Sequence, residues 1–145
     1  MTFINAAVVT DSYTSEDFIL YSVKNGKNDW TKGISSFSRE HLVQCAIPEE
    51  NIEKVSVKAM KYEDLIRVYG IDSLDVLIID TEGYDYELLK SFPFEVFMPS
   101  IIHFEHNMSS SSGMSKIQFG EISNKLKSSG YNAYVDTTDC TAYKY

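Results

Sequence analysis

The pattern of hydrophobic and polar positions changes character near the middle of the chain. In the first half, short apolar or alternating runs are separated by turn-rich stretches, which predicts β-strands over residues 3–9, 17–23 and 54–60. Residues 24–38 are rich in Asn, Gly and Ser, and this composition predicts a surface loop. Trp30 within that loop is either an anchor that packs on the core or a contact for a ligand or partner.

The second half alternates between helix and strand patterns. Apolar residues recur at helical spacing over residues 62–69, 84–92 and 114–128. Nearly continuous apolar runs, typical of parallel strands covered on both faces, occupy residues 74–79 and 100–104. A closing hairpin is predicted for residues 131–135 and 141–145. This order of elements predicts an α/β fold in a single domain, residues 1–145, with strands 74–80 and 100–106 as parallel neighbours.

Size and charge narrow the class of protein. The 145 residues suit one domain, and 13 basic against 21 acidic residues give a net charge of −8. This charge argues against nucleic acid or an anionic membrane surface as partner. The two cysteines, Cys45 and Cys140, have no histidine partner nearby in the sequence and are interpreted as structural. Without a secretory leader or an apolar run of ~20 residues, the sequence predicts a cytoplasmic protein.

Polar side chains gather where the two central strands end. Residues 80–83 follow the first strand and residues 105–107 follow the second. Ligands bind at the carboxyl ends of parallel strands, and neighbouring strands lie ~4.8 Å apart, so the two clusters would face one crevice. The alternative is that the carboxylates cap the following helices. We favour capping or loop stabilisation for Glu82, but not for Asp80 and Glu105.

Several familiar catalytic motifs are absent from the sequence. No Gly-x-Gly occurs, so dinucleotide and phosphate-loop fingerprints are excluded, and neither His-Glu-x-x-His nor Gly-x-Ser-x-Gly is present. His41 and His103 are isolated in the sequence, and His103 is interpreted as a satisfied core residue.

One stretch carries a family resemblance. Residues 74–90, Leu-Asp-Val-Leu-Ile-Ile-Asp-Thr-Glu-Gly-Tyr-Asp-Tyr-Glu-Leu-Leu-Lys, resemble the central motif of FkbM-type methyltransferases. Residues 99–106 resemble the next strand of that family, residues 5–8 an earlier strand, and residues 130–131 the start of its closing hairpin. The family's first strand with a Gly-rich turn, and its second strand with an acid for ribose, have no counterpart here. The resemblance therefore implies the C-terminal part of the family domain.

The resemblance implies a fold and a chemistry. The fold is a partial class I methyltransferase sheet, Rossmann-like and mostly parallel, with a C-terminal antiparallel hairpin. The chemistry is S-adenosylmethionine-dependent O-methylation of a sugar or metabolite hydroxyl on a small-molecule acceptor. Because the Gly-rich turn is missing, we expect this chain to bind S-adenosylmethionine weakly or not at all.

The resemblance also assigns candidate roles. The expected catalytic residues are Asp80 on the cofactor or metal side, with Glu105 or His106 as base or acceptor-positioning group. The expected cofactor-binding residues are Asp80, Glu82 and Gly83. A possible Mg²⁺ or Mn²⁺ site would use Asp80, Glu105 and Asn107, because hard cations prefer oxygen ligands.

Two alternatives to this chemistry stay open. The first is a non-catalytic α/β binding or assembly module, since a sheet that lacks strands exposes an edge that a second copy could cover in a homodimer. The second is a metal-dependent hydrolase that uses the same carboxylates.

Overall fold

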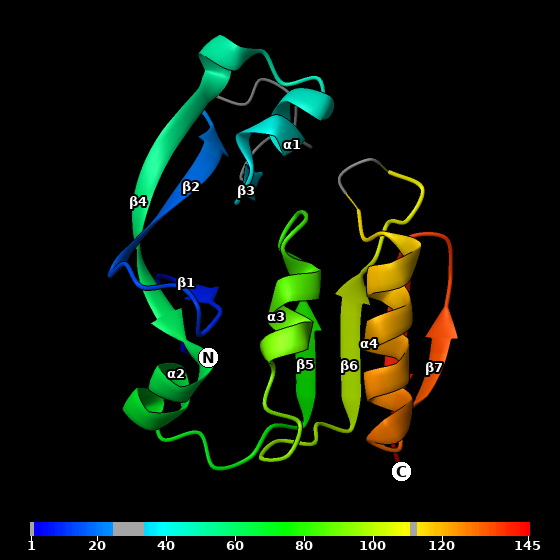
Figure 1. Cartoon of the computed structure of the whole chain (residues 1–145). Helices are drawn as coiled ribbons and strands as arrows, with labels where there is room; N and C mark the ends of the chain where they lie inside the picture. The colour runs from blue at the N-terminus through cyan, green and yellow to red at the C-terminus, as the bar shows by residue number, and fades with distance from the viewer. Residues whose placement is uncertain (1, 25–33, 111–112) are drawn as a thin grey trace.

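The computed structural model describes residues 2–24, 34–110 and 113–145, so Trp30 lies outside the described residues. The described chain forms two four-stranded sheets joined by helix α2 and flanked by three further α-helices (Figure 1). Within these ranges, no helix combines the length and the apolar character needed to cross a membrane.

The N-terminal sheet has the strand order β1-β4-β2-β3. Its strands are β1 (Ala6–Val9), β2 (Asp17–Val23), β3 (Ser35–Ser36) and β4 (Ile52–Lys61). β1 runs parallel to the end of β4, whereas β2 is antiparallel to both β4 and β3. The three strands predicted in the first half are confirmed, and β3 is a short addition within the predicted loop.

Two short helical segments lie between β3 and β4. Helix α1 (Arg39–Gln44) begins at Ser38, whose hydroxyl accepts the backbone N–H of His41 at 3.3 Å, and a 3₁₀ turn, η2 (Glu49–Asn51), leads into β4. After β4, helix α2 (Tyr62–Tyr69) ends at Gly70, which adopts φ 60°. This left-handed cap suits glycine and confirms the predicted helix end.

The C-terminal sheet has the order β5-β6-β8-β7. Its strands are β5 (Val76–Ile79), β6 (Ile101–Glu105), β7 (Asn132–Val135) and β8 (Asp139–Tyr143). β5 and β6 are parallel, with Val76 opposite Ile101, which confirms the prediction of parallel neighbours. β8 is antiparallel to both β6 and β7, which confirms the closing hairpin.

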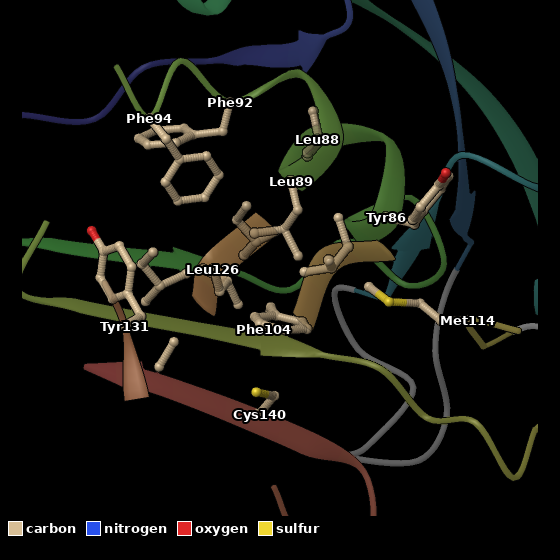
Figure 2. Packing of buried hydrophobic residues seen from close by; sticks show 14 of the residues in the cluster. Tyr86, Leu88, Leu89, Phe92, Phe94, Phe104, Met114, Leu126, Tyr131 and Cys140 are labelled. Atoms are coloured by element: carbon tan, nitrogen blue, oxygen red, sulfur yellow. The ribbon is translucent and has the colours of Figure 1, made fainter. Parts of the chain in front are cut away.

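Helices α3 (Asp85–Ser91) and α4 (Lys116–Ser128) lie against one face of the C-terminal sheet (Figure 1). Helix α4 begins with a capping box, in which Ser115 and Gln118 exchange hydrogen bonds between side chain and backbone. The main core fills the space between these helices and the sheet (Figure 2). Its most deeply buried members are Leu89, Ile102, Phe104, Ile122, Leu126, Cys140 and Ala142.

The expectation of one mostly parallel sheet is wrong, although the α/β class is confirmed. Each sheet contains one parallel and two antiparallel pairings. The reason lies in β4, which spans ten residues and is long enough to pair with β2 along its length and with β1 at its end. β1 is thereby held in the N-terminal sheet, and β5 pairs with β6 alone among the described strands.

Candidate functional site

Two bends in the backbone shape the carboxyl ends of β5 and β6. Glu82 (φ 51°) and Gly83 (φ 105°) are consecutive left-handed residues in the turn between β5 and α3, and Asn107 (φ 34°) follows β6. Left-handed conformations cost energy in residues other than glycine and are concentrated at functional sites. Because β5 and β6 are parallel neighbours, their carboxyl ends meet at the same end of the C-terminal sheet, and both strained turns lie there.

A small polar cavity of about 70 Å³ lies beside these turns, where β6, α3 and the start of α4 meet. This volume corresponds to about two or three water molecules. The polar side chains that line the cavity belong to Asp85, Tyr86, Glu105, His106 and Gln118. The structure thus brings two of the predicted catalytic residues, Glu105 and His106, to one cavity.

Glu105 is a partly buried carboxylate at the end of β6, and its pKa is raised from 4.5 to about 7. Burial is the largest cause of this shift, because it disfavours the charged form. Negative charges raise the pKa further, in the order Glu82, Asp85, Asp80 and Asp139. General acid–base catalysis is most efficient when the pKa of the catalytic group lies near the working pH. A carboxylate with a pKa near 7 meets this condition at neutral pH.

Asp85 is a site residue that sequence reasoning missed. Its side chain is only 2% exposed, and Oδ2 accepts hydrogen bonds from the Thr81 hydroxyl at 2.8 Å and the Thr81 N–H at 3.4 Å. Oδ1 has no hydrogen-bond partner among the described residues, and burial raises the pKa of the carboxyl. In the sequence, Asp85 resembles an ordinary acid in the first turn of a helix, so only its position after Gly83 and Tyr84 could have singled it out.

His106 is buried to the same extent and packs against Phe119, with ring centroids 4.9 Å apart. Its Nδ1 accepts the backbone N–H of Met108 at 3.4 Å, while Nε2 has no partner among the described residues. An accepting Nδ1 places the proton of the neutral ring on Nε2.

Glu82 turns away from this cavity toward the N-terminal part of the chain. Its Oε2 lies 3.1 Å from Nε2 of His41 in α1, and its backbone carbonyl accepts the Ser36 hydroxyl at 3.0 Å. Glu82 therefore joins β3 and α1 to the turn after β5. It stabilises this loop but does not cap α3, which has no side-chain cap.

The sequence-based statement that Cys45 has no histidine nearby is wrong. His41 is four residues earlier in the chain, and its Nε2 lies 3.5 Å from Sγ of Cys45. Glu82 contacts that same nitrogen, so the three groups do not form a relay in which a base and an orienting acid use opposite ring atoms. Burial raises the pKa of the Cys45 thiol, which disfavours the nucleophilic thiolate. The structural interpretation of Cys45 fits this environment.

Asp80 lies apart from Glu105. It is exposed and, with Thr81, lines one end of a groove of about 370 Å³ between β1 and β5, whose walls are mainly apolar side chains such as Leu77 and Ile79. The expected single crevice is therefore divided: Asp80 faces the groove, and Glu105 faces the small cavity, which Gly83 also lines.

The expected metal set is not assembled. No group of three or more His, Cys, Asp or Glu side chains in the described ranges is placed to hold a metal ion. Asn107 directs its Nδ2 toward Glu105 at 3.5 Å, while its Oδ1 accepts the Ser109 hydroxyl at 3.3 Å. An amide nitrogen is not a ligand for Mg²⁺ or Mn²⁺, so in this orientation Asn107 presents no ligand atom toward Glu105, and its role in a metal site stays a prediction.

His103 also differs from expectation. It lies on the face of the C-terminal sheet opposite the main core, with 43% of its side chain exposed, and Nδ1 is 2.9 Å from the Thr141 hydroxyl. His103 has a hydrogen-bond partner, as predicted, but it is not a core residue.

These features define an α/β domain with a polar cavity at the carboxyl ends of a parallel strand pair. The family described as methyltransferase FkbM domain matches residues 1–133, and the chain therefore belongs to the FkbM methyltransferase family. No curated protein and no solved structure matches the chain.

The family implies S-adenosylmethionine as cofactor. The groove between β1 and β5 offers Asp80 and Thr81 at one end, but its remaining lining is dominated by apolar and aromatic side chains. The sequence has no Gly-x-Gly turn to approach the cofactor closely. In the part of the chain that the structure describes, this groove therefore offers S-adenosylmethionine few polar partners.

Proposed function

We propose that this chain forms the acceptor side of an S-adenosylmethionine-dependent methyltransferase that methylates a hydroxyl group of a sugar or other small metabolite. The observation that carries this proposal is Glu105, a partly buried carboxylate with a pKa of about 7 on the wall of a polar cavity. Membership of the FkbM family supports the methyltransferase class.

In this proposal Glu105 is the general base. An acceptor hydroxyl in the cavity gives its proton to the Glu105 carboxylate, and the oxygen keeps the electron pair of the broken O–H bond. A positioned base of this kind contributes about 10²–10⁴-fold to a rate. The surrounding carboxylates that raise the pKa of Glu105 also make it a stronger base at the pH where it is ionised.

The test compares Glu105→Gln with His103→Gln in the transfer of a labelled methyl group to a panel of sugars and phenols, at millimolar S-adenosylmethionine. We expect the unmodified protein and His103→Gln to gain activity as the pH rises through about 7, because the base form of Glu105 accumulates there. Glu105→Gln should lower kcat/KM by about 10²–10⁴-fold and abolish this pH dependence. Equal rates for both variants, or no transfer by any protein, would contradict the proposal.

A second candidate function is a non-catalytic assembly module, and the free edge of β5 favours it. β5 is paired on one side only among the described strands, and its Ile78 side chain is 67% exposed beside the apolar groove. Exposed strand edges with apolar side chains are sites of pairing with another chain.

This candidate predicts a homodimer, because a second copy could cover the β5 edge. Light scattering should then give a molecular mass that rises toward twice that of the 16.5 kDa chain as concentration increases. Substituting Ile78→Lys should return the mass to that of the monomer. A constant monomer mass over a hundredfold range of concentration would eliminate the dimer.

A further inference from the structure

The groove between β1 and β5 has the size and the lining of a small-molecule site. Its volume of about 370 Å³ lies within the range of about 300–1,000 Å³ that is typical of ligand pockets. Its walls are mainly apolar side chains from β1, β2, α2, β5 and α3. Ile78, which lines the groove, is 67% exposed, so part of the apolar wall is accessible to a molecule from solution.

The apolar surroundings continue behind the groove. A cavity of about 110 Å³ shares Tyr62, Leu65 and Leu77 with the groove, and its other lining residues, such as Phe92 and Phe97, are apolar. Apolar cavities of this kind stay dry and accept small apolar molecules. An occupant of the groove that extends toward α2 therefore meets apolar surface, and its body must be apolar as well.

One end of the groove carries a negative charge. Asp80 is the one acidic or basic residue among the described residues that line the groove, and the Tyr62 hydroxyl stays neutral because burial raises its pKa. Asp80 is exposed, and no hydrogen bond or ion pair joins its carboxylate to another described residue. Its charge raises the pKa values of Asp85 and Glu105, so negative charge accumulates at this end of the C-terminal sheet. A cation is favoured beside Asp80, and an anion is disfavoured.

We propose that the groove binds a small organic cation, namely a protonated amine attached to an aromatic or aliphatic body. The ammonium group lies at Asp80, and the body lies against Leu77 and Ile78. A sugar does not fit this groove, because its hydroxyl groups would face apolar walls without partners. S-adenosylmethionine does not fit either, because polar groups flank its sulfonium on both sides. The site goes beyond the proposed methyltransferase function, since Glu105 lines a different cavity.

NMR of backbone amides in the ¹⁵N-labelled full chain tests the site with four probes. The probes are phenethylammonium chloride, 2-phenylethanol, sodium 3-phenylpropanoate and methylammonium chloride. Phenethylammonium should shift amides of β5 and α2 in a saturable way in the millimolar range and bind about threefold more tightly than 2-phenylethanol. The propanoate should bind more weakly than the alcohol, and methylammonium, which has no apolar body, should not saturate. Equal affinities for phenethylammonium and the propanoate would overturn the proposal.

Charge variants locate the ammonium group. Asp80→Asn should bind phenethylammonium only as tightly as 2-phenylethanol and leave the affinity for the alcohol unchanged. Asp75→Asn, an exposed acid at the other end of β5 and outside the groove, should keep the threefold preference. Raising the salt concentration from about 10 mM to about 1 M should remove the preference in the unmodified protein, because the screening length falls from about 30 Å to about 3 Å. A preference that persists in Asp80→Asn would refute the role of Asp80.

A second pair of variants locates the apolar body. Ile78→Ala should weaken the binding of phenethylammonium and 2-phenylethanol alike, by about threefold, because it removes apolar surface from the wall of the groove. Val76→Ala, on the same strand but outside the groove, should bind both probes as the unmodified protein does. Both side chains are substantially exposed, so neither variant should disturb folding. Equal effects of the two variants would contradict the placement of the body.

Two further measurements separate this occupant from others. If a second copy of the chain covers the groove, the apparent affinity for phenethylammonium will fall as the protein concentration rises tenfold, and the proposal is then wrong. If S-adenosylmethionine displaces phenethylammonium at equal concentration, the groove belongs to the cofactor and the proposal is equally wrong. Methyl transfer is assayed separately: a chain that binds the amine but transfers no methyl group refutes the proposed function alone, and the reverse result refutes the amine site alone.

Discussion

The two sheets of this protein have the same number of strands and the same mixture of pairings, but they differ in what covers them. Helices α3 and α4 cover one face of the C-terminal sheet. The main cluster of buried side chains lies between these helices and the sheet (Figure 2). In the N-terminal sheet, most side chains of β4 are exposed or partly buried. The comparison shows that backbone pairing alone does not create a core; an apolar face must also be covered by another layer.

The candidate chemistry follows the same division. The cavity with Asp85, Glu105 and His106 is built from the helix-covered sheet and its loops. The N-terminal sheet reaches this region through the contacts of Ser36 and His41 with Glu82. A well-packed layer is suited to hold reacting groups in place, because interiors packed at native density resist small displacements.

The largest expected effect is a difference in the free energy of unfolding lost when one side chain in each sheet is truncated. Phe104 on β6 is fully buried in the main core, whereas Val55 on β4 is 37% exposed. Phe104→Ala should lower the free energy of unfolding by about 3–5 kcal/mol, and Val55→Ala by less than about 1 kcal/mol. Urea denaturation followed by circular dichroism measures both. Similar losses for the two variants would show that the N-terminal sheet contributes as much to stability as the helix-covered one.

A smaller effect should come from the connection between the sheets. Ser36 is fully buried; its hydroxyl donates to the Glu82 carbonyl at 3.0 Å and accepts the N–H of Ser38 at 3.1 Å. Among the described residues, the hydroxyl of the neighbouring Ser35 donates within its own sheet, to the Ser22 hydroxyl at 3.1 Å. Ser36→Ala should cost about 1–3 kcal/mol, because it leaves buried polar groups unpaired.

Hydrogen exchange distinguishes a local from a connecting role for Ser36. In Ser36→Ala, amides of both β3 and the turn after β5 should exchange faster, while in Ser35→Ala only amides of β2 and β3 should do so. Equal exchange in the turn after β5 for the two variants would mean that Ser36 does not couple the sheets.

Sequence periodicity was sufficient to predict most of the C-terminal half. The apolar runs that became β5 and β6 are followed by segments with helical spacing, and local patterns of this kind persist in the folded chain. The pairing of β1 with β4 was not predictable in the same way, because it is a long-range choice among strands of similar composition. Helix α1 was missed because its six residues are too few to establish a period.

The candidate site divides along the same lines. Glu105 and His106 were predicted because they directly follow an apolar strand. Asp85 was missed because its importance depends on burial and on the Thr81 hydroxyl that occupies one of its two oxygens. The separation of Asp80 from Glu105 depends on side-chain direction at the strand ends, which spacing along the chain does not determine.

The smallest predicted effect concerns pH, and it returns to the comparison between the sheets. The pKa of Glu105 is raised in the folded protein from 4.5 to about 7, so between these values the folded state holds more protons than the unfolded state. Stability from this group is therefore fully present below pH 4.5 and is lost as the pH rises toward 7. Glu105→Gln removes the ionisation, and at pH 8 it should stabilise the protein by about 1 kcal/mol after allowance for solvent screening.

Thermal melts at pH 5 and pH 8 measure this difference, which amounts to about 2–4 °C for a domain of this size. Glu53→Gln, an exposed position on β4, is the matched control in the N-terminal sheet and should change stability by no more than about 0.5 kcal/mol at either pH. If Glu105→Gln and Glu53→Gln respond alike at both values, Glu105 is not held in a region of burial and crowded negative charge. The contrast between a structured C-terminal site and an exposed N-terminal sheet would then fail at the residue on which the proposed chemistry depends.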